Sequence, residues 1–560
     1  MAFQVSPGVQ VKEIDATGGV PAVSSSIGGF AGAFNTGPVG KIITISSEKD
    51  LAAVFGTPDN NTYKYFLTAA SFLKYGNSLK VVRAATDHLN ATANGDGHFI
   101  GNDDEYDALN IASINKGAWI AKYPGALGNS LKVSVCPANS SAFNAWTYKS
   151  SFSSAPGTSA YAKELGNTVA VDELHIVVID EDGLWTGTRG TILETYDFVS
   201  QASNAKSSDG SSNYYVDVIS AKSDYIRWLA APDGLTDAGD PLENTTQVYT
   251  TTVVISDSLS GGTDDNTPNA GEIGVAFDLF EDAETIDVNL LFAYPDANDS
   301  NTIALNLIGL CEGRKDCMAF VSPPIEDSRD SNTPATTVAT WVGGLTSTSY
   351  ASADSGAVYV YDKYNDTYRW IGAAGYQAGL CANADSVADA WFSPAGVNRG
   401  QLLGITKLAY NPKKADRDTL YKARTNPIVS FPGQGTILYG DKTLLSRPSA
   451  FDRINVRRLF ILLEKAIAKA SKAQLFEFND EFTRAQFRNL VEPFLRDIKG
   501  RRGITDFAVI CDDTNNDGQV VDSNRFVADI YIKPARSINF ITLNFIATRT
   551  GVEFSEIAGV

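Results

Sequence analysis

Histidine is scarce in this sequence: His88, His98 and His175 are the only three among 560 residues. None lies in an H-E-x-x-H motif or in a pair spaced by three to five residues, which excludes the usual zinc-site spacings. A G-x-S-x-G nucleophile motif is also missing. A Ser/His/Asp triad assembled from distant residues stays open, but no motif favours it. The sequence therefore predicts no catalytic site, metal site or cofactor, and we expect a protein that is not an enzyme.

Cysteine is rare as well, and the five residues are odd in number and contain no C-x-x-C pair. Neither a disulfide framework nor a zinc knuckle is indicated, and a reducing compartment fits. No apolar run approaches the roughly 18 residues that span a bilayer, and the first five residues do not begin a secretory leader. We therefore expect a soluble protein. The cysteines are Cys136, Cys311, Cys317, Cys381 and Cys511.

Two loops resemble ligand-binding motifs without completing them. The segment 435–443 approaches G-x-x-x-x-G-K-[ST], but Asp441 precedes Lys442 and would place a carboxylate beside phosphate oxygens. We expect a glycine-rich turn between strands there. The segment 513–518, which includes Asp513 and Asp517, copies the first half of a calcium loop, whereas Asn524 replaces the bidentate glutamate at its twelfth position. A polar hairpin turn is favoured, and whether this segment binds a cation stays open.

Charge is unevenly distributed along the chain. The formal net charge is -19, which argues against nucleic acid or an anionic membrane as the main partner. Residues 1–400 hold 22 Lys and Arg against 47 Asp and Glu, whereas residues 401–502 hold 20 against 10. This asymmetry predicts a basic face in the carboxyl-terminal part that is directed at an acidic surface.

The pattern of apolar residues predicts an α/β start followed by a loop-rich β region. From residue 24 we expect a strand at 41–45, helices at 47–55 and 63–75, and a strand at 79–83. Between about 91 and 365, short β-like runs alternate with polar loops, as expected of insertion domains. The elements expected there are strands at 131–136, 174–179, 251–255 and 318–321, and a helix at 301–314.

Beyond about residue 391 the chain becomes regular again. A helix is predicted from Val456 through Ala470, with an apolar stripe on one side and Arg458, Lys465, Lys469 and Lys472 on the other. This basic stripe is either a solvated face or a contact surface. A second helix spans 487–498, although Pro493 should kink or shorten it. Strands are expected at 507–511, 527–532 and 538–546.

Both ends of the chain look like strands without local partners. Alternating apolar residues occur within residues 1–22 and again within 546–560. We expect extended arms, and the family resemblance described below implies that they pair with other subunits. The residues that would carry this pairing are Val5, Val9 and Val11 in the first arm and Val552, Phe554 and Ile557 in the second.

Several long motifs resemble the tail sheath protein family of contractile-tailed bacteriophages, in the form found in T-even-like myoviruses. They include AWFSPAGVNRG at 390–400, NPIVSFPGQG at 426–435 and FDRINVRRLF at 451–460. Near the amino end, FGTP at 55–58 and PGALGNSL at 124–131 also match. The resemblance covers 1–135 in pieces and 370–560 almost continuously, whereas 136–365 matches mainly at 310–316.

The resemblance implies a multi-domain α/β and β fold. An inner α/β domain carries both chain termini, loop-rich insertion domains lie outside, and extended arms end the chain. The boundaries that we expect are 1–22 for the amino-terminal arm, 23–92 with 190–365 for a middle α/β domain, 93–189 for an outer β-rich insertion domain, 366–545 for an inner tube-facing α/β assembly domain, and 546–560 for the carboxyl-terminal arm.

The resemblance also implies a mechanical function. Subunits would stack as hexameric rings around an inner tail tube and contract to drive the tube through the host envelope, without nucleotide. Partners would be other copies, the tube protein, and baseplate and tail terminator proteins, with no nucleic acid and no membrane insertion. The protein would reside in the virion tail after assembly in the host bacterial cytoplasm, with the basic stripe facing the tube. The alternatives are a hydrolase with a subtilisin-like central domain and a surface-layer or adhesin-type protein.

Overall fold

The computed structural model describes residues 20, 23–85, 87–235, 238–243, 245–264, 266–296, 299–539 and 542. Two compact units can be distinguished. The large unit comprises Ala22–Ala390 and Pro394–Lys465. The small unit comprises, among its described residues, Trp391–Ser393 and the chain from Ala466 onward. The boundary between the units falls within one helix, α13 (Ile454–Ser471).

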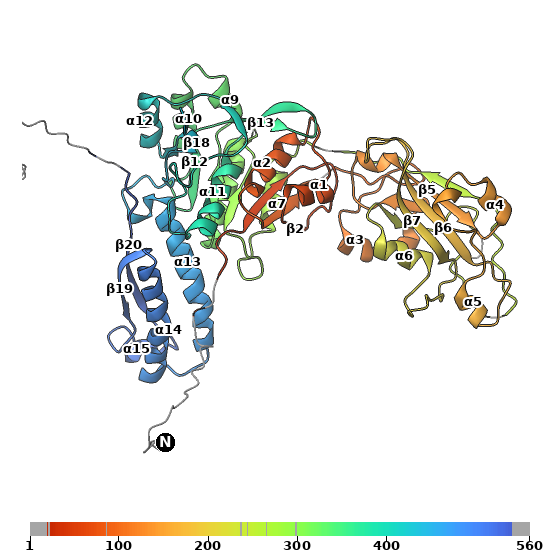
Figure 1. Cartoon of the computed structure of the whole chain (residues 1–560). Helices are drawn as coiled ribbons and strands as arrows, with labels where there is room; N and C mark the ends of the chain where they lie inside the picture. Colours follow the sequence, from red (N-terminus) through yellow and green to blue (C-terminus); the bar gives the residue numbers. More distant parts are fainter. Residues whose placement is uncertain are drawn as a thin grey trace, which may run out of the picture. The chain divides into compact units, whose positions relative to one another are not determined.

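A seven-stranded sheet forms the centre of the large unit (Figure 1). Six of its strands are parallel, and only β2 at one edge runs antiparallel to its neighbour. Both faces of such a sheet are buried, which suits apolar runs such as β11. In spatial order the strands are β16 (Thr425–Asn426), β12 (Ala351–Asp354), β11 (Met318–Val321), β10 (Leu290–Phe292), β1 (Gly28–Gly32), β3 (Leu79–Arg83) and β2 (Ile42–Ile45).

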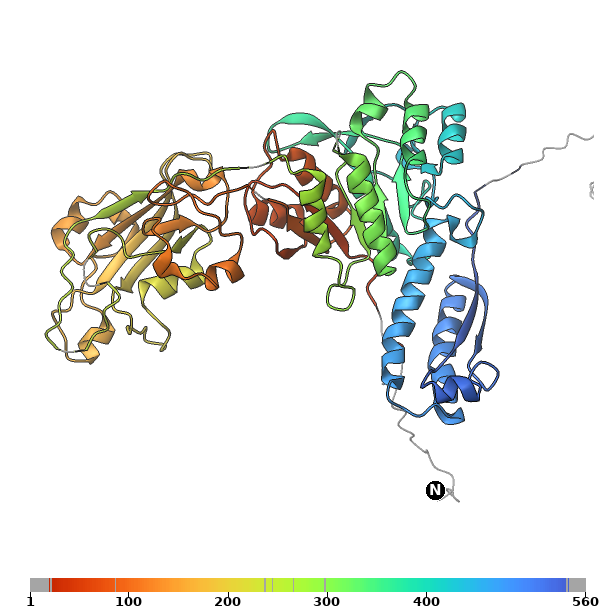
Figure 2. The ribbon, with the colours of Figure 1, turned by 180° about the vertical axis from the view of Figure 1, so that it is seen from behind.

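Helices cover both faces of this sheet. α2 and α11 pack against each other on one face, and α7 and α8 pack against each other on the opposite face, as the views from two sides show (Figures 1 and 2). This arrangement confirms the α/β start expected from the sequence. The helices of the large unit outside its β-rich part are α1 (Glu48–Phe55), α2 (Tyr63–Leu73), α7 (Ala270–Asp278), α8 (Ser300–Arg314), α9 (Ile325–Arg329), α10 (Pro334–Gly343), α11 (Ala374–Val387) and α12 (Lys414–Lys422).

Two smaller antiparallel sheets complete this part of the large unit. One has the order β14-β13-β15 and the other is the hairpin β17-β18. The bounds are β13 (Val358–Asp362), β14 (Thr367–Ile371), β15 (Ile405–Leu408), β17 (Ile428–Phe431) and β18 (Gly435–Leu438). The boundary expected between residues 365 and 366 is wrong, because β13 and β14 pair across it and β16 joins the central sheet.

A β-rich part is inserted between β3 and α7. It contains a four-stranded antiparallel sheet of order β7-β6-β5-β9 and a two-stranded sheet, β4-β8. Its strands are β4 (Trp119–Ala121), β5 (Leu131–Pro137), β6 (Glu173–Asp180), β7 (Thr191–Ser200), β8 (Ile226–Trp228) and β9 (Ile255–Ser258). Its short helices are α3 (Asp103–Asp107), α4 (Ser140–Ala145), α5 (Ala160–Glu164) and α6 (Tyr215–Lys222).

The expected outer boundary at residue 189 is also wrong. β7 pairs with β6 along its length, and β9 pairs with β5, so the insertion continues to about residue 260. The physical reason is a shared core, in which Val133, Ile176 and Ile219 are all buried. The strand expected at 251–255 is displaced along the chain, because β9 begins at Ile255 and ends at Ser258.

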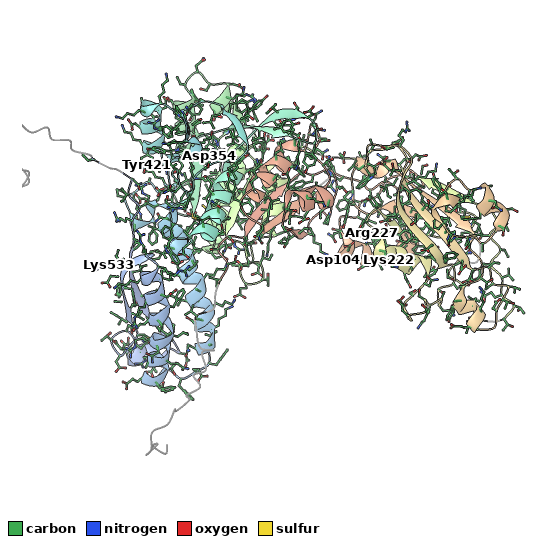
Figure 3. The ribbon with its side chains drawn as sticks, in the orientation of Figure 1. Asp104, Lys222, Arg227, Asp354, Tyr421 and Lys533 are labelled. Atoms are coloured by element: carbon green, nitrogen blue, oxygen red, sulfur yellow. The ribbon has the colours of Figure 1, made fainter. Side chains whose placement is uncertain are left out.

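In the small unit, α14 (Glu481–Gly500) packs against β19 (Ile504–Ile510), which pairs antiparallel with β20 (Asp529–Pro534). The segment that connects the two strands contains α15 (Gly518–Asp522). Lys533 marks β20 in Figure 3. Of the two effects expected of Pro493, a kink or a shorter helix, the second does not occur, because α14 continues to Gly500. Of the strand expected at 538–546, only residues 538, 539 and 542 are described, and they are not in a strand.

No helix in the described part of the chain combines the length and the apolar character needed to cross a membrane.

Candidate functional site

The basic stripe predicted on α13 begins with Arg458, and the structure contradicts an exposed role for this residue. Its side chain is only 4% exposed. It donates to both carboxylate oxygens of Asp385, at 2.7 and 2.6 Å, and to the carbonyl oxygens of Cys381 and Ser25. Burial disfavours the cation, but the charge of Asp385 raises the pKa of Arg458 above its ordinary value. Arg458 therefore fixes α13 to α11 and is not available to another protein.

The other three residues of the stripe differ in exposure. Lys465 is paired with Asp287, and its ammonium lies 3.8 Å from Asp316. Lys469 and Lys472 are exposed. Of the four candidates, only these two present their charge to solvent. The sequence pattern missed the difference because the acidic partners Asp385 and Asp287 are remote along the chain.

The arm residues Val5, Val9, Val11, Val552, Phe554 and Ile557 lie outside the described residues. Their predicted pairing with other subunits stays a prediction.

The phosphate-loop-like segment begins with a strand, and the glycine-rich turn lies just before it, at residues 432–434. Its first part is β18, which pairs with β17 in register from Ile428 opposite Leu438 to Phe431 opposite Gly435. Lys442 then folds back and donates to the carbonyl oxygen of Tyr421 at 2.7 Å, with its ammonium 3.9 Å from the centre of that ring. Burial lowers the pKa of Lys442. The lysine is thus held by Tyr421, which Figure 3 labels in the large unit, and does not converge with backbone amides on an anion site.

The calcium-like segment connects β19 to β20, and its polar groups are engaged within the small unit. Asp513 pairs with Arg484, and Asp517 caps α15 by accepting from the amide of Val520 at 2.9 Å. Asp512 accepts from the amide of Thr514 at 2.9 Å. Within the described residues, no three His, Cys, Asp or Glu side chains are grouped so as to hold a metal ion.

The usual ligand crevice of an open α/β sheet is partly filled here by side chains. Strand order reverses between β1 and β10, and ligands commonly bind outside the carboxyl ends of such strands. Tyr65 packs so closely on the end of β1 that a Cβ on Gly32 would lie 2.7 Å from its ring. Tyr65 also contacts Tyr294, which follows β10, with ring centres 5.4 Å apart. Tyr65 and Tyr294 therefore occupy part of this crevice.

A buried Ser–Asp pair lies farther along the same sheet, but it has no histidine beside it. Ser322 donates to Asp354 at the end of β12, and the amide of Gly356 donates to the same carboxyl group at 2.9 Å. Burial raises the pKa of Asp354 to about 7. Figure 3 labels this residue. His175 instead lies in the β-rich part, where its ring stacks on Phe152. The hydrolase alternative receives no support from this geometry.

One exposed feature was not singled out as a site by sequence reasoning. Residues 475–482, hereafter the apolar loop, comprise the segment before α14 and the first two residues of that helix. They carry four large side chains in solvent: Leu475, Phe476, Phe478 and Phe482, with exposed fractions of 62, 105, 85 and 76%. The signal that could have found it is a dense apolar run without helical or strand periodicity. Contiguous exposed apolar surface of this kind marks interaction sites.

Comparison with known proteins covers nearly the whole chain. Family models described as phage tail sheath protein central domain, phage tail sheath C-terminal domain and tail sheath protein Gp18 domain III N-terminal region match residues 273–444, 446–548 and 26–84. The tail sheath protein of Vibrio phage KVP40 is 33% identical, with 99% of this chain and 100% of that protein covered. The tail sheath protein of Enterobacteria phage T4 is 32% identical, with 99% of each covered.

Solved structures share the fold at much lower sequence identity. The sheath tail protein of Desulfitobacterium hafniense has 13% identity and a TM-score of 0.53, with 95% of this chain and 97% of that chain covered. The PVC sheath complex of an extracellular contractile injection system, in its contracted state, has 13% identity and a TM-score of 0.51, with 98 and 99% covered.

Proposed function

This chain belongs to the phage tail sheath protein family, and from that membership we propose that it is the structural subunit of a contractile sheath. Copies stack as hexameric rings around an inner tail tube, and the sheath shortens to drive the tube through the host cell envelope. The observation that carries the proposal is similarity at 31 to 33% identity to three tail sheath proteins across 99% of this chain.

The work of contraction comes from two packings of the same subunits, and the protein is not an enzyme. Two observations support this view. Lys442 of the phosphate-loop-like segment is held by Tyr421, and Tyr65 packs closely on the end of β1, where strand order reverses. Extended tails freed of nucleotide and divalent cations should therefore still contract when the baseplate is triggered. ATP turnover coupled to shortening would contradict this.

The partners follow from the same proposal. They are other copies of this chain, the tube protein, and baseplate and tail terminator proteins, and the assembled protein is a component of the virion tail. A similar structure, at 12% identity, is described as an anti-feeding prophage baseplate, which suits contact with a baseplate. Within the basic stripe, Lys469 and Lys472 are the candidates for tube contact because their side chains are exposed.

Electron microscopy tests the proposed function directly. The purified protein is concentrated or mildly heated, and we expect tubular sheath-like polymers. Amorphous aggregate or stable monomer under all such conditions would count against it. Removal of residues 1–22 or 546–560 should abolish tubes while leaving the melting temperature of the monomer nearly unchanged. A truncated chain that still forms tubes would refute the role of that arm.

A further inference from the structure

Hydrogen bonds to the rest of the small unit fix the conformation of the apolar loop. Asn479 donates to the carbonyl oxygen of Arg525 at 2.8 Å and accepts from Arg484 at 2.8 Å, so a polar side chain of the loop is turned toward the small unit. Phe476 adopts φ +70°, an uncommon conformation for a bulky residue. The neighbouring rings of Phe478 and Phe482 remain in solvent. A braced backbone thus presents apolar side chains outward, where water makes them costly unless a partner covers them.

This surface is also acidic. Residues 475–482 contain three acidic side chains, Glu477, Asp480 and Glu481, and no basic one. All three are exposed. Asp480 accepts from the amide of Thr483 at 2.8 Å and caps α14, whereas Glu477 and Glu481 have no ion pair among the described residues. The partner of the apolar loop should therefore be basic, with apolar surface of its own.

The opposite end of the same helix has this complementary character. Residues 496–502 contain four basic side chains, Arg496, Lys499, Arg501 and Arg502, against one acidic side chain, Asp497. All four are exposed, with Arg496 at 71%. Three of them pair with carboxylates at the surface of the same unit, Arg496 with Glu492 at 3.8 Å, Lys499 with Asp506 at 3.0 Å and Arg501 with Asp497 at 3.8 Å, and such exposed pairs are weak enough to exchange partners. The amide of Ala535 donates to the carbonyl of Gly503 at 3.1 Å and brings the following segment to this end, where Ile538 is 82% exposed. We call this surface the basic end of α14.

The two surfaces cannot meet within one chain. α14 has 20 residues, so at about 1.5 Å per residue its ends are roughly 30 Å apart. We propose that the apolar loop of one copy docks on the basic end of α14 in the next copy. The aliphatic stems of the arginines and Ile538 cover the phenylalanine rings, and the guanidinium groups face Glu477 and Glu481.

A contact between two different surfaces of identical chains is head to tail, so it propagates from copy to copy into a ring or a helical filament. This inference rests on the proposed function, because it assumes self-assembly, and it names a surface apart from the terminal arms. The charges determine the orientation of the contact, because two apolar loops facing each other would bring acidic side chains together.

Charge reversal in two complementary variants tests the contact. The first variant carries Glu477→Lys and Glu481→Lys, and the second carries Arg496→Glu and Arg502→Glu. Each alone should assemble at least about tenfold more slowly by light scattering, because like charges then face each other. An equimolar mixture should regain assembly, since every loop finds an opposite charge, and electron microscopy should show tubes. A chain with all four changes should assemble alone.

Controls separate this inference from the proposed function. Phe476→Ser with Phe478→Ser should slow assembly, whereas Val275→Ser and Val387→Ser, at 69 and 68% exposed positions of the large unit, should not. Circular dichroism melting confirms that each variant folds. Failure of the unmodified chain to form tubes would refute the proposed function. Normal tubes from either charge variant alone, or no recovery in the mixture, would overturn the docking contact while leaving sheath assembly intact.

Discussion

Arg458 and Asp385 form a buried, two-pronged ion pair between α13 and α11. The Nη2 atom of Arg458 lies 2.7 and 2.6 Å from the two carboxylate oxygens, and the side chains are 4 and 11% exposed. Water cannot replace either partner at such a site, so the loss of one leaves the other charge unpaired in the interior.

Asp385→Asn should therefore lower the free energy of unfolding by about 3 to 5 kcal/mol. Urea unfolding followed by circular dichroism measures this. The matched control is Asp104→Asn, whose pair with Lys41 has exposed fractions of 78 and 39%, and which should cost no more than about 1 kcal/mol. Equal effects of the two substitutions would contradict the assignment of Arg458 to the interior.

Asp354 should make stability depend on pH. Its folded-state pKa, raised by burial to about 7, exceeds the value of about 3.9 expected when unfolded. The folded state thus holds a proton that the unfolded state releases, and its contribution is fully present below about pH 4 and lost as pH rises to about 7. Asp354→Asn should make the free energy of unfolding less dependent on pH between about 4 and 7. The stability of this variant relative to the parent should therefore be greater at pH 8 than at pH 5. Parallel profiles of melting temperature against pH would contradict this.

Pro493 should weaken α14. Proline cannot donate the backbone hydrogen bond that an interior helical position requires, yet the helix continues past it to Gly500. Pro493→Ala should slow hydrogen exchange of the α14 amides, with a stabilisation of about 1 to 3 kcal/mol. Gln486→Ala, at an exposed position of the same helix, serves as the control and should change little. Faster exchange in Pro493→Ala would mean that the packing of α14 depends on the proline.

Lys442 should act in stability and not in nucleotide binding. Lys442→Ala removes a hydrogen bond to the Tyr421 carbonyl and a cation held over that ring, and should cost about 1 to 2 kcal/mol of unfolding free energy. Lys422→Ala, at the exposed end of α12, should cost less than about 0.5 kcal/mol. Calorimetric titration of the parent with magnesium ATP should give no binding heat. Saturable binding that Lys442→Ala abolishes would contradict this interpretation.

Parts of the fold could be predicted because local patterns and tertiary packing agree. β11, with the sequence MAFV, is a short apolar run, as buried parallel strands usually are. β1 is the central counterexample. Its sequence, GGFAG, has no β-branched residue, but a Cβ on Gly28 would lie 2.7 Å from Phe72 and one on Gly29 would lie 2.5 Å from Leu291. Neighbouring side chains approach the backbone of β1 so closely that glycine is required at these positions. This requirement comes from tertiary packing, so residue propensities within the strand do not predict it.

The candidate site was less predictable for a similar reason. Helical periodicity correctly placed Lys469 and Lys472 on an exposed face, but it also placed Arg458 there. The residue that makes the difference, Asp385, precedes Arg458 by 73 positions. The domain boundaries were predicted wrongly because β7 and β9, which follow long loops, pair with the earlier strands β6 and β5. Long-range pairing of this kind leaves no local mark in one sequence.

The chain enters and leaves the β-rich part at adjoining points. Leu89 and Thr263 exchange backbone hydrogen bonds at 3.2 and 3.1 Å, and just before this junction Arg83 holds the carbonyls of Phe34, Gly37 and Pro124. Because the two ends of the inserted segment already lie side by side, a short connector could replace the segment with only a small loss of chain entropy on loop closure. The central sheet therefore places few constraints on the size or fold of the inserted segment. Such a junction allows the β-rich part to vary, or to be replaced by another domain, while the central sheet is retained.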